Sequence, residues 1–338
     1  MGKNIVFFAD GTWQVLDQKT PTNVAKMYSA ASNGPGQVTQ YDPGVGTDGN
    51  PIDWLAGGVS GAGLLDKIKD GYKYIAGNYQ PGDQISIFGF SRGAYTARSL
   101  AGMIAVCGLP DHDQVTNQSV SDAFVAYRTR TNRDHLLDTL KQKYGNNTYN
   151  IEIVMVGVWD TVGALGIPES LFATLDSALY GFLDTNLHQD IKAACHALAI
   201  DENRQEFAPT LWQPNGTSAL AQVWFPGGHS DVGGGLPSDE LSKIALKWMV
   251  LQAKRYGVQF NPQNFSDITG VPFNPAKATV TLTKCLAPPK LRNVPTDAVL
   301  ANDVGMMVGN DPPPYHPANL LYQPDGTLSA GYGTQDVV

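Results

Sequence analysis

The sequence is poor in cysteine and contains no long apolar run. Its 3 cysteines in 338 residues form no short metal-type spacing, and an odd number argues against a disulfide framework. We expect each thiol to pack as a small apolar group. Only five apolar or small residues precede Asp10, too few for the core of a signal peptide, and no other run approaches a membrane span. We therefore expect synthesis in the cytosol, with signal-independent export left open. The cysteines are Cys107, Cys195 and Cys285.

Charge is also sparse, and it is weighted toward acid. Charged residues make up 16% of the chain, and 23 Lys and Arg residues oppose 31 Asp and Glu residues, for a formal net charge of -8. A protein that neutralises nucleic-acid phosphates carries a basic stripe, and this sequence has none. Nucleic acid is therefore not an expected partner, although one local basic patch could still bind an anion. The 42% hydrophobic content suits a compact enzyme rather than a disordered chain.

Continuous apolar runs alternate with stretches of helical periodicity. A short apolar run bounded by polar residues is typical of a strand buried on both faces of a sheet. Alternation of such strands with amphipathic helices predicts an α/β fold, a mostly parallel sheet with helices on both faces. The predicted strands are 5–9, 84–89, 151–159 and 222–225, and the predicted helices are 64–79, 94–107 and 241–256.

Two regions depart from this alternation of strands and helices. Residues 164–195 are apolar with little charge, so they form either a lid inserted over the site or helices that pack on the sheet. Residues 257–338 are rich in Pro, Asn and Gly, with a strand predicted at 278–282. No linker sets this part off. We expect a single domain over residues 1–338, with a catalytic core at about 4–256 and the remainder as an irregular extension packed on it.

The sharpest motif is GFSRG, which stands where a predicted strand ends and a predicted helix begins. A serine on such a tight turn has a strained backbone, so the residues two before and two after it must be small. Gly89 and Gly93 meet that need, and the resulting nucleophile elbow would present the Ser91 hydroxyl above the sheet. The helix N-terminus that follows favours an oxyanion, with the Arg92 N–H as its first donor. This pattern predicts a sheet of the α/β-hydrolase type.

A serine hydroxyl needs a neighbouring base, and His229 is the histidine best placed to act as one. It follows the predicted strand 222–225 in the glycine-rich loop PGGHSDVGGG, from which it can reach a neighbouring elbow. His196 lies in an apolar stretch that we interpret as helical, where a structural role is the commoner one. The other histidines stand in polar or proline-rich surroundings: His112, His135, His188 and His316.

Asp160 is the predicted acid that orients the imidazole. It follows the predicted strand 151–159 and should leave the sheet at the same edge as the serine. The resulting chain order of Ser, Asp and His is that of the α/β-hydrolases. Asp201 and Asp231 are the competing carboxylates. Because Asp231 is only two residues from His229, it is better suited to shaping the loop.

The loop after the first predicted strand is the candidate for a second oxyanion donor. The N–H of Gly11 or of Thr12 could fill this role, with Asp10 tying the loop down. An ordinary Asp–Gly turn that ends a strand is an equally good interpretation of the same residues.

No cofactor and no metal site is predicted. The glycine-rich segments 44–47 and 57–63 lack the Lys–Ser/Thr pair of a P-loop, and neither is a dinucleotide fingerprint directly after a strand. They are better interpreted as flexible loops. Asp10, Asp42 and Asp48 are the carboxylates that the fold could still bring together around a metal.

Six motifs occur along the chain in a fixed order. Together they cover about residues 4–250 and resemble an uncharacterised α/β-hydrolase-domain family that includes type VI secretion phospholipase effectors. The resemblance implies a triad, which falls on Ser91, Asp160 and His229, and ester hydrolysis, with phospholipid as the substrate class of the effector branch. Family effectors are often much longer, with added regions that engage membrane or secretion partners. The motifs are FADGTW near the start, YDPGVGT at 41–47, PGDQISIFGFSRGAYTAR at 81–98, VGVWDTVG at 156–163, HALAIDENRQEFAPTLW at 196–212 and WFPGGHSDVGGG at 224–235.

The leading hypothesis is a cofactor-independent serine hydrolase that cleaves carboxylic esters, lipid-like esters above all, through an acyl-enzyme. Its partners would be a small-molecule or lipid ester and, transiently, a membrane surface. An amidase, a thioesterase or an acyltransferase on the same scaffold is the first alternative. The second is a catalytically silent module whose partner docks on the Pro-rich tail or on residues 165–195. The oligomeric state stays open.

Overall fold

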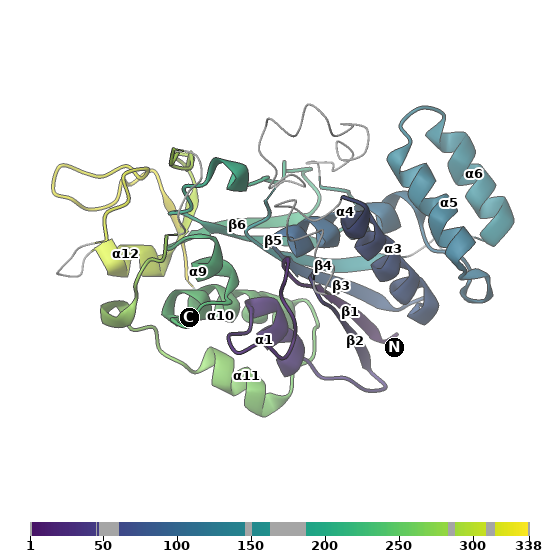
Figure 1. The fold of residues 1–338 in the computed structure, drawn as a ribbon, viewed down its shortest axis with the longest axis horizontal. Helices are drawn as coiled ribbons and strands as arrows, with labels where there is room; N and C mark the ends of the chain where they lie inside the picture. The colour runs from purple at the N-terminus through teal and green to yellow at the C-terminus, as the bar shows by residue number, and fades with distance from the viewer. Residues whose placement is uncertain are drawn as a thin grey trace.

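A parallel β-sheet of eight strands runs through the protein (Figure 1). The strand order is β2-β1-β3-β4-β5-β6-β7-β8, and every neighbouring pair is parallel. The computed structural model describes residues 2–44, 46, 61–145, 151–162, 187–282, 288–308 and 315–336. The strands are β1 (Asn4–Ala9), β2 (Gln37–Asp42), β3 (Gln84–Phe90), β4 (Glu152–Trp159), β5 (Ala193–Ala199), β6 (Ala219–Phe225), β7 (Val299–Ala301) and β8 (Gly333–Gln335).

Helices cover both faces of the sheet (Figure 1). One face is covered by α3, α4, α5 and α6, and the other by α1, α10 and α11. This two-sided cover explains why β1, β3, β4 and β5 are buried almost continuously rather than at alternate residues. The helices are α1 (Asn23–Ala30), α3 (Gly61–Asn78), α4 (Arg92–Cys107), α5 (Asn117–Arg128), α6 (Arg133–Tyr144), α9 (His229–Gly233), α10 (Glu240–Arg255), α11 (Pro262–Thr269) and α12 (Asn302–Val308).

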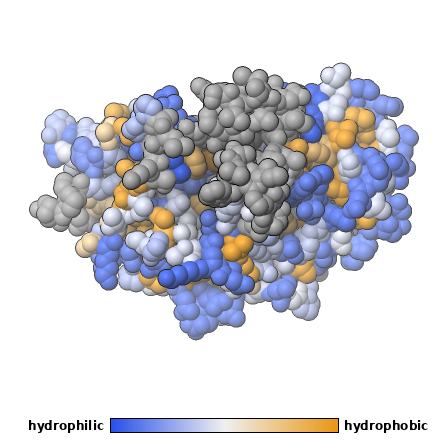
Figure 2. Space-filling model, viewed as in Figure 1, coloured by the Kyte–Doolittle hydropathy of each residue, from blue (hydrophilic) through white to orange (hydrophobic). Residues whose placement is uncertain are grey.

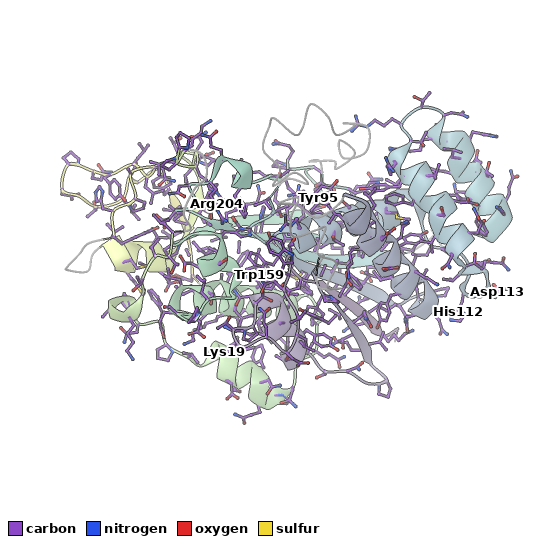
Figure 3. The ribbon with its side chains drawn as sticks, in the orientation of Figure 1. Lys19, Tyr95, His112, Asp113, Trp159 and Arg204 are labelled. Atoms are coloured by element: carbon purple, nitrogen blue, oxygen red, sulfur yellow. The ribbon has the colours of Figure 1, made fainter. Side chains whose placement is uncertain are left out.

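Alternate residues of β1 serve two separate hydrophobic cores. In β1, Ile5 and Phe7 pack in the core beneath α3 and α4, whereas Val6 and Phe8 pack in the core beneath α1 and α10. Figure 3 shows Trp159, the last residue of β4, in the interior of the molecule. The C-terminal ends of the strands are thus held rigidly from both sides, which is what a precise site requires.

The order of the strands places a crevice at the C-terminal edge of the sheet. β1 lies between β2 and β3, so the chain leaves β1 toward β2 on one side and leaves β3 toward β4 on the other. Ligands bind at such switch points in open α/β sheets. β3 and β4 are in register through Phe90 and Trp159. Ser91 and Asp160, the next residue of each strand, therefore leave the sheet side by side. His229 follows β6 on the same edge.

The structure confirms the predicted α/β fold. The four strands predicted between residues 5 and 225 and all three predicted helices are present, with ends shifted by no more than three residues. The last of these helices, α10, has an acidic start, since Asp239 is its N-cap and Glu240 lies in its first turn. Asp239 makes no side-chain cap, however, and its carboxylate instead pairs with Lys243 at 2.8 Å.

Two local predictions were wrong. The apolar stretch around His196 is the strand β5 rather than a helix, and all seven of its residues are buried. A strand covered on both faces and a buried helix give the same continuous apolar run. Residues 278–282 form no strand. The Thr281 N–H instead donates to Asp231 Oδ2 at 2.7 Å, so this backbone contacts the His229 loop rather than a neighbouring strand.

The segment 164–195, for which a lid and packed helices were the two interpretations, falls largely outside the described residues, since the structure describes this part of the chain only from residue 187 onward. Its last three residues belong to β5 and cannot move as a lid. Cys195 is buried in that strand, and Cys107 is partly buried, as expected for small apolar groups. Cys285 and Asp48 also lie outside the described residues.

The C-terminal part of the chain is more regular than predicted. It contributes α11 and α12, and β7 and β8 extend the same sheet. The single-domain organisation stays a prediction. Figure 2 shows a mostly hydrophilic face on which apolar residues gather only in small groups. Within the described ranges, no helix has the length and apolarity needed to cross a membrane.

Candidate active site

Ser91 stands on a strained turn between β3 and α4. Its backbone angles are φ 58° and ψ -121°, a left-handed conformation that is rare outside glycine. The turn needs glycine on both sides. A Cβ on Gly89 would lie 2.3 Å from the Gly93 carbonyl oxygen, and a Cβ on Gly93 would lie 2.2 Å from the Ala9 carbonyl oxygen. These contacts are the steric reason for the spacing of the GFSRG motif.

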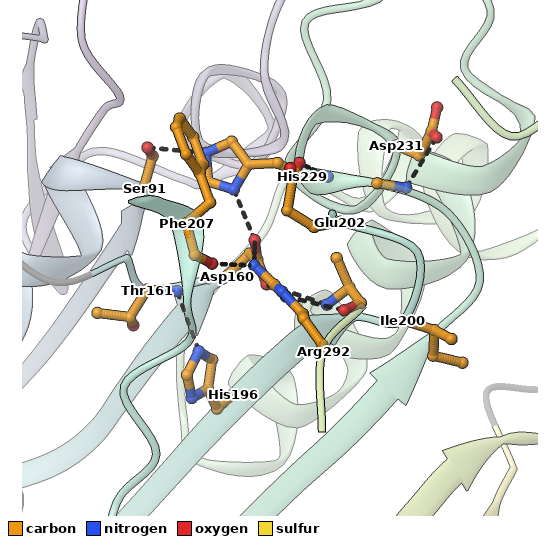
Figure 4. A network of polar contacts seen from close by, with 12 residues as sticks. Ser91, Asp160, Thr161, His196, Ile200, Glu202, Phe207, His229, Asp231 and Arg292 are labelled. Carbon is orange, nitrogen blue, oxygen red and sulfur yellow. Dashed lines mark hydrogen bonds and ion pairs between the residues drawn. The ribbon is translucent and has the colours of Figure 1, made fainter. Parts of the chain in front are cut away.

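The structure brings Ser91, His229 and Asp160 into one hydrogen-bonded chain (Figure 4). His229 Nε2 lies 2.8 Å from Ser91 Oγ, and His229 Nδ1 lies 2.6 Å from Asp160 Oδ2. With the imidazole neutral, Nδ1–H donates to the carboxylate and Nε2 accepts from the hydroxyl. All three side chains are buried. This arrangement can remove the proton of a serine hydroxyl.

The loop after β6 holds the imidazole in place. Gly227 has φ 104°, and a Cβ there would lie 2.4 Å from the Cβ of Asp231. Asp231 accepts hydrogen bonds at Oδ2 from the N–H groups of Gly228, at 2.9 Å, and Thr281, so it links this loop to the backbone at 281. The His229 N–H donates to Glu202 Oε2 at 3.2 Å.

Two phenyl rings pack against the imidazole of His229. The ring of Phe90 lies 4.6 Å from it, centroid to centroid, and the ring of Phe207 lies 4.8 Å away in an edge-on arrangement. Apolar walls of this kind exclude water and leave the imidazole few alternative rotamers.

Asp160 is held on both sides of its carboxylate. Its Oδ1 accepts from the Ala199 N–H at 3.0 Å. Arg292 approaches in a fork, with Nη1 2.6 Å from Oδ1 and Nη2 2.9 Å from Oδ2. The same guanidinium also donates to the carbonyl oxygens of Ala199, at 2.8 Å, and Phe207, at 2.6 Å. Arg292 thereby ties the C-terminal part of the chain to the carboxylate.

Burial and charge set the protonation states of the site. Burial alone would raise the pKa of Asp160, but the Arg292 guanidinium and the His229 hydrogen bond outweigh it and hold that pKa well below its usual range. Burial lowers the pKa of His229, although Asp160 opposes this shift. The resting site at neutral pH therefore pairs a carboxylate with a neutral imidazole, the state that a general base requires.

The loop after β1 lies beside the elbow. Asp10 fixes it through three hydrogen bonds, accepting from Gly11 N–H at 2.7 Å, from Thr22 Oγ1 at 2.6 Å and from the Tyr41 hydroxyl at 2.7 Å. Because the Gly11 N–H already donates to Asp10, the Thr12 N–H is the better of the two predicted oxyanion donors.

The Arg92 N–H belongs to the first residue of α4. The first N–H groups of a helix have no acceptor within it, so this group can serve an oxyanion. The Arg92 side chain donates to Thr12 Oγ1, which joins the two candidate donor segments to each other.

Sequence reasoning missed three residues around the triad. Arg292 is 132 residues from Asp160 in sequence and stands in a proline-rich segment with no periodic pattern. Glu202 is buried beside His229 and pairs with Arg204 at 2.7 Å, and Phe207 packs on the imidazole. Both occur in the motif at 196–212, but nothing in their local spacing marks them as site residues.

The competing candidates lie elsewhere. His196 accepts the Thr161 N–H at Nε2, 3.1 Å away, and its burial lowers its pKa to about 3. Asp201 accepts from the Tyr315 hydroxyl at 2.6 Å and from the Gly227 N–H at 2.6 Å. Figure 3 shows His112 at the periphery. Among the described residues, no group of His, Cys, Asp and Glu side chains could hold a metal ion.

Residues 3–252 match the family described as "T6SS, Phospholipase effector Tle1-like, catalytic domain". The chain belongs to this family. The match covers the sheet from β1 to β6 and therefore contains the elbow, Asp160 and His229. Arg292 lies beyond the matched residues. The family's description supports lipid-ester hydrolysis as the general chemistry of such domains.

This Tle1-like domain is similar to an uncharacterized protein of Saccharomyces cerevisiae, at 27% identity over 237 residues, or 63% of the chain. The chain spans about a third of that relative's length, 33%. Among solved structures, an uncharacterized protein from Pseudomonas aeruginosa matches with a TM-score of 0.46 and 18% identity, covering 79% of this chain and 49% of that one. The Tle1 effector bound to the VgrG spike matches with a TM-score of 0.41 and 17% identity, covering 70% and 52%.

Proposed function

We propose that the chain is a serine hydrolase that cleaves carboxylic esters of lipids through an acyl-enzyme. The observation that carries the proposal is the hydrogen-bonded chain from Ser91 Oγ through His229 to Asp160, at 2.8 Å and 2.6 Å, with the serine on a strained turn of the nucleophile-elbow type. Family membership supports the same chemistry. The reaction needs no cofactor.

Each step of the proposed reaction uses a group of this site. Ser91 Oγ attacks the ester carbonyl carbon while its proton passes to His229 Nε2. The negative oxygen that develops is stabilised by the N–H groups of Arg92 and Thr12. The C–O bond to the leaving alcohol then breaks, and the alcohol takes the proton from His229. A water molecule, deprotonated by the same imidazole, cleaves the acyl-enzyme and restores the serine.

Lipid is the proposed substrate class for two reasons. The family is described by its phospholipase effectors. In addition, Trp13 and Val15 on the loop after β1 are exposed, at 49% and 38%, next to the segment that carries Thr12. An exposed aromatic ring suits the interface of a membrane or micelle. We accordingly propose transient membrane contact through this loop, and signal-independent export by a type VI secretion system, as the family's description suggests.

The test compares Ser91→Ala with Ser121→Ala, a matched substitution of an exposed serine on α5. On a panel of phospholipids and simple carboxylic esters, we expect Ser91→Ala to lose at least about 1,000-fold in kcat/KM and Ser121→Ala to lose nothing. Thioesters and amides in the same panel separate a thioesterase or an amidase from an esterase. Complete inactivity of the wild type on every substrate would favour a binding module and contradict the proposal.

A further inference from the structure

A second cavity lies beside α4, distinct from the triad. Its volume is about 420 Å³, and its walls come from α4, the end of α5, β4 and the segment before β5. Ser91, Asp160 and His229 do not line it. Arg98, at one end of the lining, is seven residues after Ser91, which is about 10 Å along a helix. The other lining residues of α4, Ala101, Gly102 and Val106, lie farther still.

The cavity contains a buried guanidinium whose donors are only partly used. Arg98 is 5% exposed. Its Nη1 donates to the carbonyl oxygen of Thr210, and its Cζ lies over the ring of Trp212, 4.3 Å from the ring centroid. Its Nε and Nη2 atoms are buried without a hydrogen-bond partner. A buried charge of this kind is costly unless an opposite charge and hydrogen bonds compensate it. Arg292, by comparison, has the carboxylate of Asp160.

Further positive charge surrounds Arg98. The cavity is also lined by Arg130, Arg133 and His188. Arg133 donates through Nε and Nη2 to backbone carbonyls of α5 and the turn after it. His188 stands 3.5 Å from the carboxylate of Asp190, which is half exposed. Burial lowers the pKa of Arg98 to about 9, so its guanidinium is still charged at neutral pH.

We propose that this cavity binds a phosphate group, held by the free donors of Arg98 at the floor and by Arg130 and Arg133 nearer the solvent. A guanidinium fork matches the tetrahedral oxygens of phosphate in two parallel hydrogen bonds. Three guanidinium groups match the double negative charge of a phosphate better than the single negative charge of a carboxylate. The phosphate belongs either to a soluble phosphate ester or to a lipid headgroup. The proposal does not depend on the role of Ser91, because none of its residues touches the triad.

Calorimetry with inorganic phosphate and with glycerol 3-phosphate tests the site on the full chain. We expect binding to the wild type, at least about 10-fold weaker binding to Arg98→Gln, and no change for Arg255→Gln, an exposed arginine on α10. Circular dichroism establishes that the variants fold. If Arg98→Gln does not fold, the exposed Arg130→Gln replaces it, with an affinity loss of about 3-fold expected from a partly solvated charge.

Vesicles distinguish the two sources of the phosphate. Phosphatidylcholine vesicles, with and without about one fifth phosphatidic acid, are sedimented with the wild type and the Arg98 variant. Binding of glycerol 3-phosphate in solution without sedimentation on the acidic vesicles identifies a soluble ligand, and Arg98-dependent sedimentation that requires phosphatidic acid identifies a headgroup. The inference is overturned if the wild type binds phosphate in neither form, or if the folded test variant binds it as tightly as the wild type does.

Discussion

At the scale of single residues, the carboxylate of Asp160 is shared between a base and a permanent cation. The imidazole of His229 and the guanidinium of Arg292 both bind it, and all three groups are buried. A triad carboxylate normally stabilises the imidazolium that forms during attack. Here Arg292 neutralises part of that charge, which favours the neutral imidazole. Arg292 is therefore a positioning residue that also tunes the base.

This sharing predicts a characteristic pH dependence. The imidazole must be neutral in the resting enzyme, so kcat/KM falls as the pH drops through the folded pKa of His229. Burial places that pKa below its ordinary value of 6.5. We therefore expect the acid limb of the profile of kcat/KM against pH to have its midpoint below pH 6.5. In Arg292→Gln the full charge of Asp160 acts on the imidazole, which raises its pKa and moves the limb upward by about one pH unit.

Arg292→Lys is the control for this shift, because it keeps the positive charge while losing the fork. Its acid limb should stay close to that of the wild type. Glu202 and Arg204, the other charges that influence His229, are unchanged in both variants. An acid limb that stays in place in Arg292→Gln would show that the arginine acts only as a structural brace.

The sequence predicts the three residues of the proposed triad, which the structure brings together, but not Arg292. Ser91 lies in a motif whose glycines have a direct steric reason, and Asp160 and His229 both follow apolar strands. Arg292 has no such local sign. Its role exists only because β7 and β8 return the chain to the sheet, a tertiary contact that no pattern within the segment expresses.

At the scale of elements, burial on both faces decides what can be predicted. Strands β1, β3 and β4 are short apolar runs with polar ends, so they were assigned correctly. β5 has the same composition but includes His196, and its continuous burial gives no period to distinguish strand from helix. β2 (QVTQYD) is an edge strand with polar residues, and no apolar run marks it as a strand.

The strand assignment of His196 has a consequence for stability. Burial lowers its pKa in the folded protein to about 3 from the ordinary value of 6.5, so the unfolded chain takes up the proton first. The stability contributed by the neutral form is present above pH 6.5 and is lost as the pH falls toward 3. In chemical denaturation, His196→Gln should reduce the loss of unfolding free energy between pH 7 and pH 5 by about 2 kcal/mol.

His229 is buried in both proteins, so its own contribution cancels in this comparison. The glutamine amide oxygen can still accept the Thr161 N–H, which limits other losses. An equal loss of stability in the variant and the wild type would mean that the strand opens locally and that His196 titrates freely.

At the scale of the whole molecule, one sheet edge collects groups from the entire length of the chain. Loops after β1, β3, β4 and β6 meet there, and Arg292 from the C-terminal part joins them. The order of the strands makes this possible, because the switch point between β1 and β3 opens the crevice. The phosphate cavity lies apart, beside α4.

The most direct test of the central claim is the mapping of a covalent adduct. After reaction with a fluorophosphonate and digestion, mass spectrometry should find the added mass on Ser91 alone. Labelling should be lost in Ser91→Ala and strongly slowed in His229→Ala, since the hydroxyl then lacks its base. Labelling of another residue, or undiminished labelling of the Ser91 variant, would contradict the account.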